Sequence, residues 1–158
     1  MALRRRLALV LAMALVFPAC GDDVTTPTGQ RAVIAVTVDP NPVPASQSPL
    51  TGAISVGYKI VITETNGGTG KVLFVSSQIF DPESGAQVAL TYFDSADLKV
   101  FVGSDTIEPR GTLTVPQTAS YILPDFRKEA QMTVNVQVQG DQGLLINQAV
   151  LVRIEYAP

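Results

Sequence analysis

The chain has 158 residues, with 11 basic and 14 acidic side chains, one cysteine, and neither histidine nor tryptophan. This composition excludes the common zinc sites and the Ser-His-Asp and Cys-His catalytic arrangements. The acidic balance disfavours nucleic acid, whose binding calls for a basic face. Catalysis by Asp, Glu, Lys or Tyr alone stays open. We nevertheless expect a protein that is not an enzyme, with no cofactor and no metal.

The N-terminus has the order of an export signal. Three arginines, Arg4 to Arg6, precede an unbroken apolar run from Leu7 to Phe17, and Ala19 then stands before Cys20. A positive segment, an apolar segment and a small residue at the cleavage site define such signals. The run has 11 residues, whereas a membrane-spanning helix needs about 20. Residues 1–19 are therefore predicted to be a signal peptide, and its removal leaves a net charge of −6.

The end of this signal also carries a resemblance. Phe17-Pro18-Ala19-Cys20 is similar to the lipobox of bacterial lipoproteins, in which a small residue precedes a lipid-bearing cysteine. Ala19 and Cys20 match that pattern, whereas Phe17 and Pro18 replace its usual leucine and small residue. The resemblance implies that Cys20 carries lipid and holds the protein to a membrane of the bacterial cell envelope, facing the periplasm or the cell surface. The alternative is an ordinary signal peptide with an incidental cysteine.

A polar segment separates Cys20 from the rest of the chain. Residues Gly21–Gln30 contain a single apolar side chain, that of Val24. Such a segment buries too little surface to order itself, so residues 20–30 are interpreted as a lipidated cysteine followed by a flexible tether. Residues 31–158 remain as the folded domain.

Apolar and polar residues alternate along most of this domain. The alternation is clearest in Ile54–Thr63, Met132–Gln139 and Val150–Tyr156, and a period of two is typical of a strand with one buried face. Turn-forming residues separate the segments; for example, Asp39-Pro40-Asn41-Pro42 is expected to end the first strand. The weaker strands are expected at Arg31–Val38, Lys71–Phe80, Gln87–Phe93, Leu98–Val102, Thr112–Val115 and Ser120–Leu123.

About eight or nine short strands with frequent turns predict an all-β fold, namely an antiparallel β-sandwich over residues 31–158. The pattern resembles the immunoglobulin-like or fibronectin-type-III-like domains of bacterial surface proteins. The chain lacks the disulfide and the core tryptophan of antibody domains, so the resemblance is one of architecture.

Four phenylalanines are the candidate partner-binding residues. They are Phe74, Phe80, Phe93 and Phe101, and they alternate with aliphatic residues and Tyr92. If Val75, Ile79, Leu90 and Tyr92 fill the core, the phenylalanines face outward on neighbouring strands, and exposed apolar patches commonly mark interaction sites. The alternative is a wrong assignment of the two faces, or cover by residues 103–121.

The loops offer weaker candidates. Asp81, Glu83 and the segment Asp94–Asp97 supply oxygen atoms that Ca²⁺ accepts, but at no known calcium-loop spacing. Residues Gly67–Gly70 are interpreted as an interstrand loop, because no phosphate-loop pattern follows them.

The sequence therefore predicts a lipid-anchored binding or structural module of the envelope, whose partner is another envelope protein. A protease inhibitor that uses the loop Ser104–Arg110, or a ligand-binding accessory lipoprotein, is the alternative.

Overall fold

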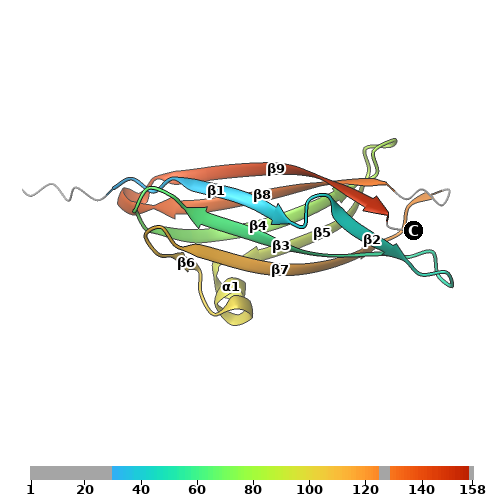
Figure 1. Ribbon diagram of the computed structural model, residues 1–158, viewed down its shortest axis with the longest axis horizontal. Coiled ribbons are helices and arrows are strands. Elements are labelled where there is room, and N and C mark those ends of the chain that lie inside the picture. Colours follow the sequence, from blue (N-terminus) through green and yellow to red (C-terminus); the bar gives the residue numbers. More distant parts are fainter. Residues whose placement is uncertain (1–29, 125–128, 157–158) are drawn as a thin grey trace, which may run out of the picture.

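The computed structural model describes residues 30–124 and 129–156, which form two β-layers and one short helix (Figure 1). The strands in chain order are β1 (Ile34–Asp39), β2 (Val43–Gln47), β3 (Ile54–Glu64), β4 (Gly70–Phe80), β5 (Gln87–Asp94), β6 (Thr106–Ile107), β7 (Thr112–Tyr121), β8 (Ala130–Gly140) and β9 (Leu145–Tyr156). The helix α1 (Ser95–Val102) follows β5, and the 3-10 turn η2 (Asp141–Gly143) joins β8 to β9. The predominance of β-structure is as predicted.

The strand pairing defines the layers. In one layer, β3 pairs with β7 along one edge and with β1 and then β2 along the other edge. The second layer has the strand order β9-β8-β4-β5, and β6 pairs with one end of β4. The prediction of a purely antiparallel arrangement is wrong at one place, because β2 runs parallel to β9. Pro40 and Pro42 end the ladder of β1, and the chain resumes as β2, which pairs with both β3 and β9 and so joins the layers.

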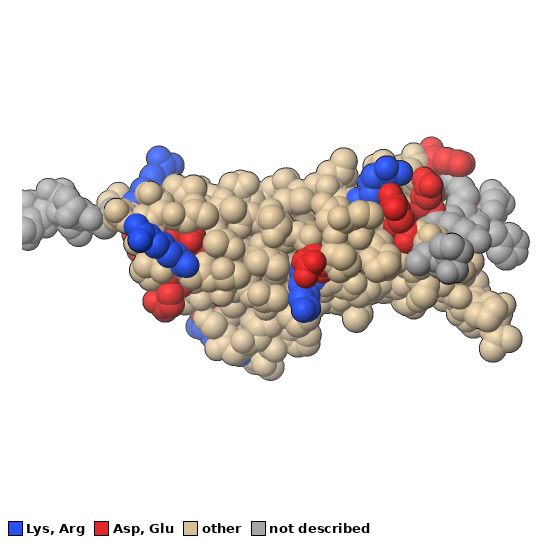
Figure 2. Space-filling model, in the orientation of Figure 1, with Lys and Arg blue, Asp and Glu red and all other residues tan. Residues whose placement is uncertain are grey.

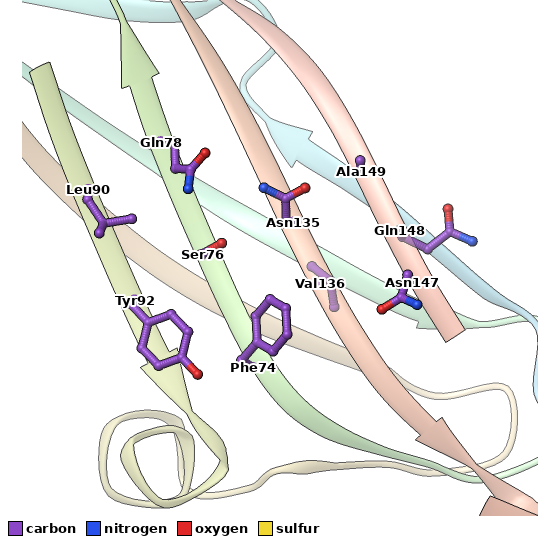
Figure 3. A pocket seen from close by; sticks show the side chains of 10 residues that line it. All are labelled: Phe74, Ser76, Gln78, Leu90, Tyr92, Asn135, Val136, Asn147, Gln148 and Ala149. Atoms are coloured by element: carbon purple, nitrogen blue, oxygen red, sulfur yellow. The ribbon is translucent and has the colours of Figure 1, made fainter. Parts of the chain in front are cut away.

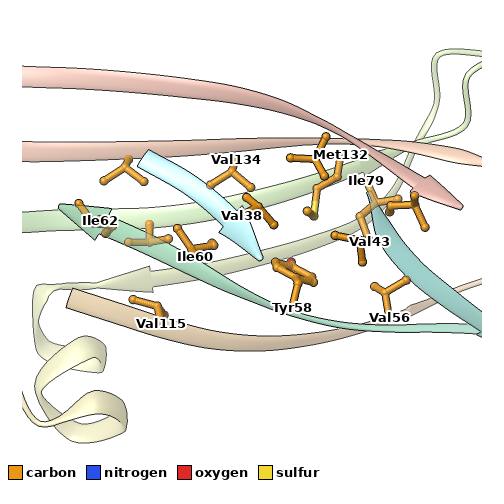
Figure 4. Close-up of a cluster of buried hydrophobic side chains, with 14 of the residues drawn as sticks. Val38, Val43, Val56, Tyr58, Ile60, Ile62, Ile79, Val115, Met132 and Val134 are labelled. Carbon is orange, nitrogen blue, oxygen red and sulfur yellow. The ribbon is translucent and has the colours of Figure 1, made fainter. Parts of the chain in front are cut away.

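The space between the layers holds the core. The inward residues of β3, from Ile54 to Ile62, are at most 4% exposed, and those of β8, from Met132 to Val138, are at most 1% exposed. Figure 4 shows side chains of both strands meeting between the layers. The alternation that predicted these strands therefore also predicted their buried faces, because successive side chains of a strand point to opposite sides.

The segment expected as a strand at Leu98–Val102 belongs instead to the helix α1. The Asp94 carboxylate accepts hydrogen bonds from the backbone N–H groups of Ala96 and Asp97, and the Asp97 side chain accepts one from the Asp94 N–H. This reciprocal capping stabilises a helix start by about 1 kcal/mol. Gly103 then ends the helix with a φ of 83°, in the left-handed region that glycine favours.

The two strands expected at Thr112–Val115 and Ser120–Leu123 are a single strand, β7. It continues through Pro116, which lies opposite Lys59 of β3. A proline is tolerated there because β7 is an edge strand that pairs only with β3, so its other edge needs no N–H donor.

A buried carboxylate fastens three segments together at one end of the layers. Glu64, the last residue of β3, is 1% exposed. Its Oε1 accepts hydrogen bonds from the backbone N–H groups of Val33 (3.1 Å) and Asn66 (2.8 Å), and its Oε2 from those of Gly67 (2.7 Å) and Arg110 (2.9 Å). Burial raises the pKa of Glu64, but the four N–H donors outweigh it and lower the pKa to about 2.

A second polar cluster lies between the layers. The Gln117 Oε1 atom on β7 accepts hydrogen bonds from the Tyr58 hydroxyl (3.0 Å) and from Ser77 Oγ (2.6 Å). Within residues 30–124 and 129–156, Gln117 Nε2 and the buried Tyr121 hydroxyl have no partner. Burial raises the pKa of Tyr121 to about 12, so its hydroxyl stays neutral in the physiological range.

These two tyrosines are expected to respond differently to loss of the hydroxyl. We expect Tyr58→Phe to lower the free energy of unfolding by about 1 kcal/mol, because a buried hydrogen bond is lost. Tyr121→Phe is expected to leave it unchanged or to raise it, because an unpaired buried hydroxyl is removed. Urea denaturation of both variants measures the difference. An equal loss in Tyr121→Phe would mean that the hydroxyl has a partner.

Candidate functional site

The layer formed by β5, β4, β8 and β9 turns one side to the core and the other outward. The strand register aligns the outward side chains in rows that cross all four strands. The three central rows are Tyr92-Ser76-Asn135-Ala149, Leu90-Gln78-Thr133-Leu151 and Asp94-Phe74-Gln137-Asn147. We call these twelve residues the outer face.

A groove of about 470 Å³ runs over the outer face (Figure 3). The Phe74 ring stacks on the Tyr92 ring, with 5.7 Å between ring centroids and 23° between ring planes. Leu90 and Tyr92 are each 55% exposed, and Leu151 is 67% exposed. The groove therefore combines an aromatic pair with the exposed aliphatic side chain of Leu90. Its lining is Phe74, Ser76, Gln78, Leu90, Tyr92, Asn135, Val136, Asn147, Gln148 and Ala149.

Amide side chains occupy much of the rest of the groove. The side chains of Gln78 and Asn135 make no hydrogen bond with any other described residue, and Figure 3 shows both from the groove side. Gln137 Nε2 donates to Asn147 Oδ1 at 2.8 Å. Each amide offers two N–H donors and one carbonyl acceptor. The amides of Gln78 and Asn135 are therefore available to a ligand that both donates and accepts hydrogen bonds.

The outer face carries almost no charge. Asp94 is the one charged residue in the three central rows, and its carboxylate caps α1. Arg153 and Glu155 lie farther along β9 and form an ion pair at 3.8 Å. On the face seen in Figure 2, the charged side chains likewise gather mainly toward the two ends of the molecule. The outer face therefore suits an uncharged ligand better than an ionic one.

The four phenylalanines predicted to form one patch lie in different places. Phe74 faces the groove, and Phe80 is half-buried at the end of β4. Phe93 is opposite Val75, faces inward and packs against the core. Phe101 lies on α1, is 54% exposed, and stacks on Phe93 at 5.2 Å. The expectation of a shared outward face is wrong, because the register of β5 against β4 turns Phe93 inward.

The same register exposes Leu90 and Tyr92, which the alternation of polar and apolar residues places in the core. Leu90 pairs with Gln78 and Tyr92 with Ser76, so both point outward. The alternation of β8 predicts only that its amides lie on the more polar side of the strand. A signal was present in the sequence, since the polar positions of β8 are Gln131, Thr133, Asn135, Gln137 and Gln139, with no charged residue among them.

The acidic loops have structural uses. Asp81 accepts hydrogen bonds from the Glu83 N–H and from the Ser84 hydroxyl in the turn after β4, and Asp94 caps α1. In the part of the chain that the structure describes, no group of three or more His, Cys, Asp or Glu side chains is placed to hold a metal ion. The loops thus add no support to the calcium hypothesis.

The segment Ser104–Arg110 is fastened to the rest of the protein. Asp105 is 4% exposed, accepts a hydrogen bond from Ser95 Oγ and lies 3.3 Å from Lys99 Nζ. Ile107 is 1% exposed and pairs with Gly70 of β4. The segment is thus held at Asp105 and Ile107, whereas Glu108–Arg110 are exposed.

The helix α1 has 8 residues. Among residues 30–124 and 129–156, no helix has the length and apolar character needed to cross a bilayer. Cys20, the predicted lipid attachment site, lies outside the described residues.

Comparison with known proteins adds information on the architecture. No protein-family model matches the sequence, and no curated protein is significantly similar to it. Two solved structures are similar in fold: structural-genomics target SoR45 (TM-score 0.59, 15% identity, 78% of this chain and 86% of that one) and the putative ApaA protein of Bordetella pertussis (TM-score 0.58, 14% identity, 78% and 95%). The likeness is one of fold. It indicates a known β-architecture and leaves the function to be argued from the outer face.

Proposed function

We propose that this protein is an exported, lipid-anchored module of the bacterial cell envelope that works by binding, without catalysis. In this proposal residues 1–19 are the signal peptide, Cys20 carries the lipid, and the residues up to 30 are the tether. The domain that follows is an immunoglobulin-like β-sandwich, and it presents the outer face to another component of the envelope.

The observation that carries this proposal is the outer face itself. Leu90 and Tyr92 are each more than half exposed on a stable sheet, beside amides that have no partner among the described residues. Exposed apolar side chains grouped around a groove commonly mark a binding site. Most of the charged residues lie away from it, so nothing in the central rows provides the paired acid and base that hydrolysis requires.

The anchor is tested by Cys20→Ser. We expect the wild-type protein to stay in the membrane fraction after a salt wash, and the variant to become extractable, because the anchoring energy comes from acyl chains at about 0.8 kcal/mol per CH₂. Immunoblots of fractionated cells measure this. An unchanged membrane fraction for Cys20→Ser would contradict lipid attachment at this residue.

The outer face is tested by a photo-crosslinking benzophenone amino acid in place of Leu90. We expect light-dependent adducts in cells from this position, because the benzophenone inserts into C–H bonds of whatever lies against the groove. The matched control is position Leu50, which is 94% exposed in the turn before β3 and lies outside the outer face. Equal adducts from both positions, or none from Leu90, would contradict the proposal.

A further inference from the structure

The chemistry of the groove points beyond binding in general to a class of ligand. Its aromatic pair, Phe74 and Tyr92, forms part of one side of the groove, and the amides of Gln78 and Asn135 lie next to it (Figure 3). Aromatic faces carry partial negative charge and attract the slightly positive C–H groups of a flat apolar surface. The amides of Gln78 and Asn135 can each donate and accept hydrogen bonds.

A sugar ring presents both features at once. A pyranose has C–H groups on its faces, which suit the exposed Tyr92 ring, and hydroxyl groups around its rim, which suit Gln78 and Asn135. The groove volume of about 470 Å³ is within the range of small-molecule sites, about 300–1,000 Å³. The groove lining contains no charged residue, so it offers no ion-pair partner to an ionised sugar.

A protein surface fits these features less well. An apolar partner would bury the amides of Gln78 and Asn135 without hydrogen bonds, at a cost of about 1–3 kcal/mol for each unpaired group. A partner held by ion pairs would find no charged group in the groove lining. The hydroxyl groups of a saccharide avoid both costs, because each can donate and accept.

Resting on the proposed function, we infer that the outer face binds a neutral saccharide chain. In this arrangement a sugar ring stacks on Tyr92 beside Phe74, and its hydroxyl groups bond to the amides of Gln78 and Asn135. The stacked pair gives affinity, and the amides set the orientation of the ring.

Titration calorimetry tests this inference on the complete protein, extracted from membranes in detergent. The probes are cellohexaose and chitohexaose, which are neutral, and an oligogalacturonate, which carries a carboxylate on each ring. We expect at least one neutral probe to bind with a dissociation constant of about 1 mM or tighter. The charged probe is expected to bind about tenfold more weakly, because the groove lining has no cation to pair with its carboxylates.

Variants locate the binding. Tyr92→Ala is expected to weaken binding roughly tenfold, since an aromatic stacking contact contributes about that factor, whereas Tyr92→Phe keeps the ring and is expected to keep the affinity. The matched control is Phe101→Ala. Phe101 is 54% exposed and also stacked on another ring, but it lies on α1 outside the groove. We expect this control to bind like the wild type.

Two results would overturn the inference. One is the absence of binding to both neutral probes, and the other is equal binding by Tyr92→Ala and the wild type. If position Leu90 then still crosslinks to a protein in cells, the saccharide is wrong while the binding module stands. If position Leu90 also gives no adduct, the proposed function fails as well.

Discussion

Glu64→Gln is expected to lower the free energy of unfolding strongly. The carboxylate accepts four backbone N–H groups, from Val33, Asn66, Gly67 and Arg110. The variant places an NH₂ group against two of those donors and removes the charge. Hydrogen bonds to a charged group contribute about 1.5–3 kcal/mol each. We expect the free energy of unfolding to fall by about 2 kcal/mol, less than the sum of the four bonds, because removing the charge also removes the cost of burying it.

The pH dependence provides an independent reading of the same carboxylate. Its pKa is about 2 in the folded protein, against 4.5 as the ordinary value. A lowered pKa means that its contribution is fully present above about pH 4.5 and is lost as the pH falls toward 2. Urea denaturation of the wild type and of Glu64→Gln should therefore give a large difference at neutral pH and a small one near pH 2.

This comparison separates Glu64 from the other acids. The pKa values of Asp105 and Asp141 are also lowered, in both cases partly by hydrogen bonds from hydroxyl groups. Asp105 is present in the wild type and in the variant, so its acid-induced loss cancels in the difference. The charge of Glu64 raises the pKa of Asp141, so this coupling remains in the difference. A difference that stays constant from neutral pH to pH 2 would refute the role given to the Glu64 charge.

Gly68→Ala is expected to have the second large effect, at the same end of the molecule. A Cβ atom at Gly68 would lie 2.4 Å from the Gln30 carbonyl oxygen and 2.6 Å from the Ala32 nitrogen. Both atoms belong to the backbone that leads into β1, so no side-chain rotation relieves the clash. Overpacking of this kind costs about 1–3 kcal/mol, and we expect a loss near the upper value because Val33, the donor to Glu64, must move too.

Gly57→Ala is the matched control for this substitution. Gly57 lies on the exposed side of β3, and a Cβ atom there would meet nothing within 4 Å. Because glycine inside a strand is about 0.5–1 kcal/mol less favourable than alanine, we expect Gly57→Ala to leave stability unchanged or to raise it. Thermal denaturation of the two variants measures the contrast. Equal melting temperatures would mean that the chain before β1 does not approach Gly68 as closely as described.

The Glu64 and Gly68 effects arise from one arrangement. The loop after β3, the chain before β1 and the turn before β7 meet around a single carboxylate, and glycine at position 68 lets two of these backbones come together. No local sequence pattern predicts this cluster, because its N–H donors lie up to 46 residues from Glu64 in the chain. Local patterns record side-chain types, whereas these donors are backbone groups that every residue except proline has.

The sequence by itself determined the strands with the clearest alternation and their buried faces. Ile54, Ile60 and Met132 are buried as predicted, because a period of two forces alternate side chains to one side of a strand. It also held the signals for the helix α1, in Asp94, Asp97 and Gly103, although the apolar residues of Leu98–Val102 favoured a strand.

Only the tertiary structure decided which side of β5 faces the core. Periodicity groups Leu90 with Tyr92 on one side of the strand, but it does not say whether that side is buried. The pairing of Val75 with Phe93 settles this, and it turns Leu90 and Tyr92 outward. A shift of one residue in register reverses every side chain of a strand. The outer face, assembled from four strands between residues 74 and 151, follows from that register and not from any local pattern.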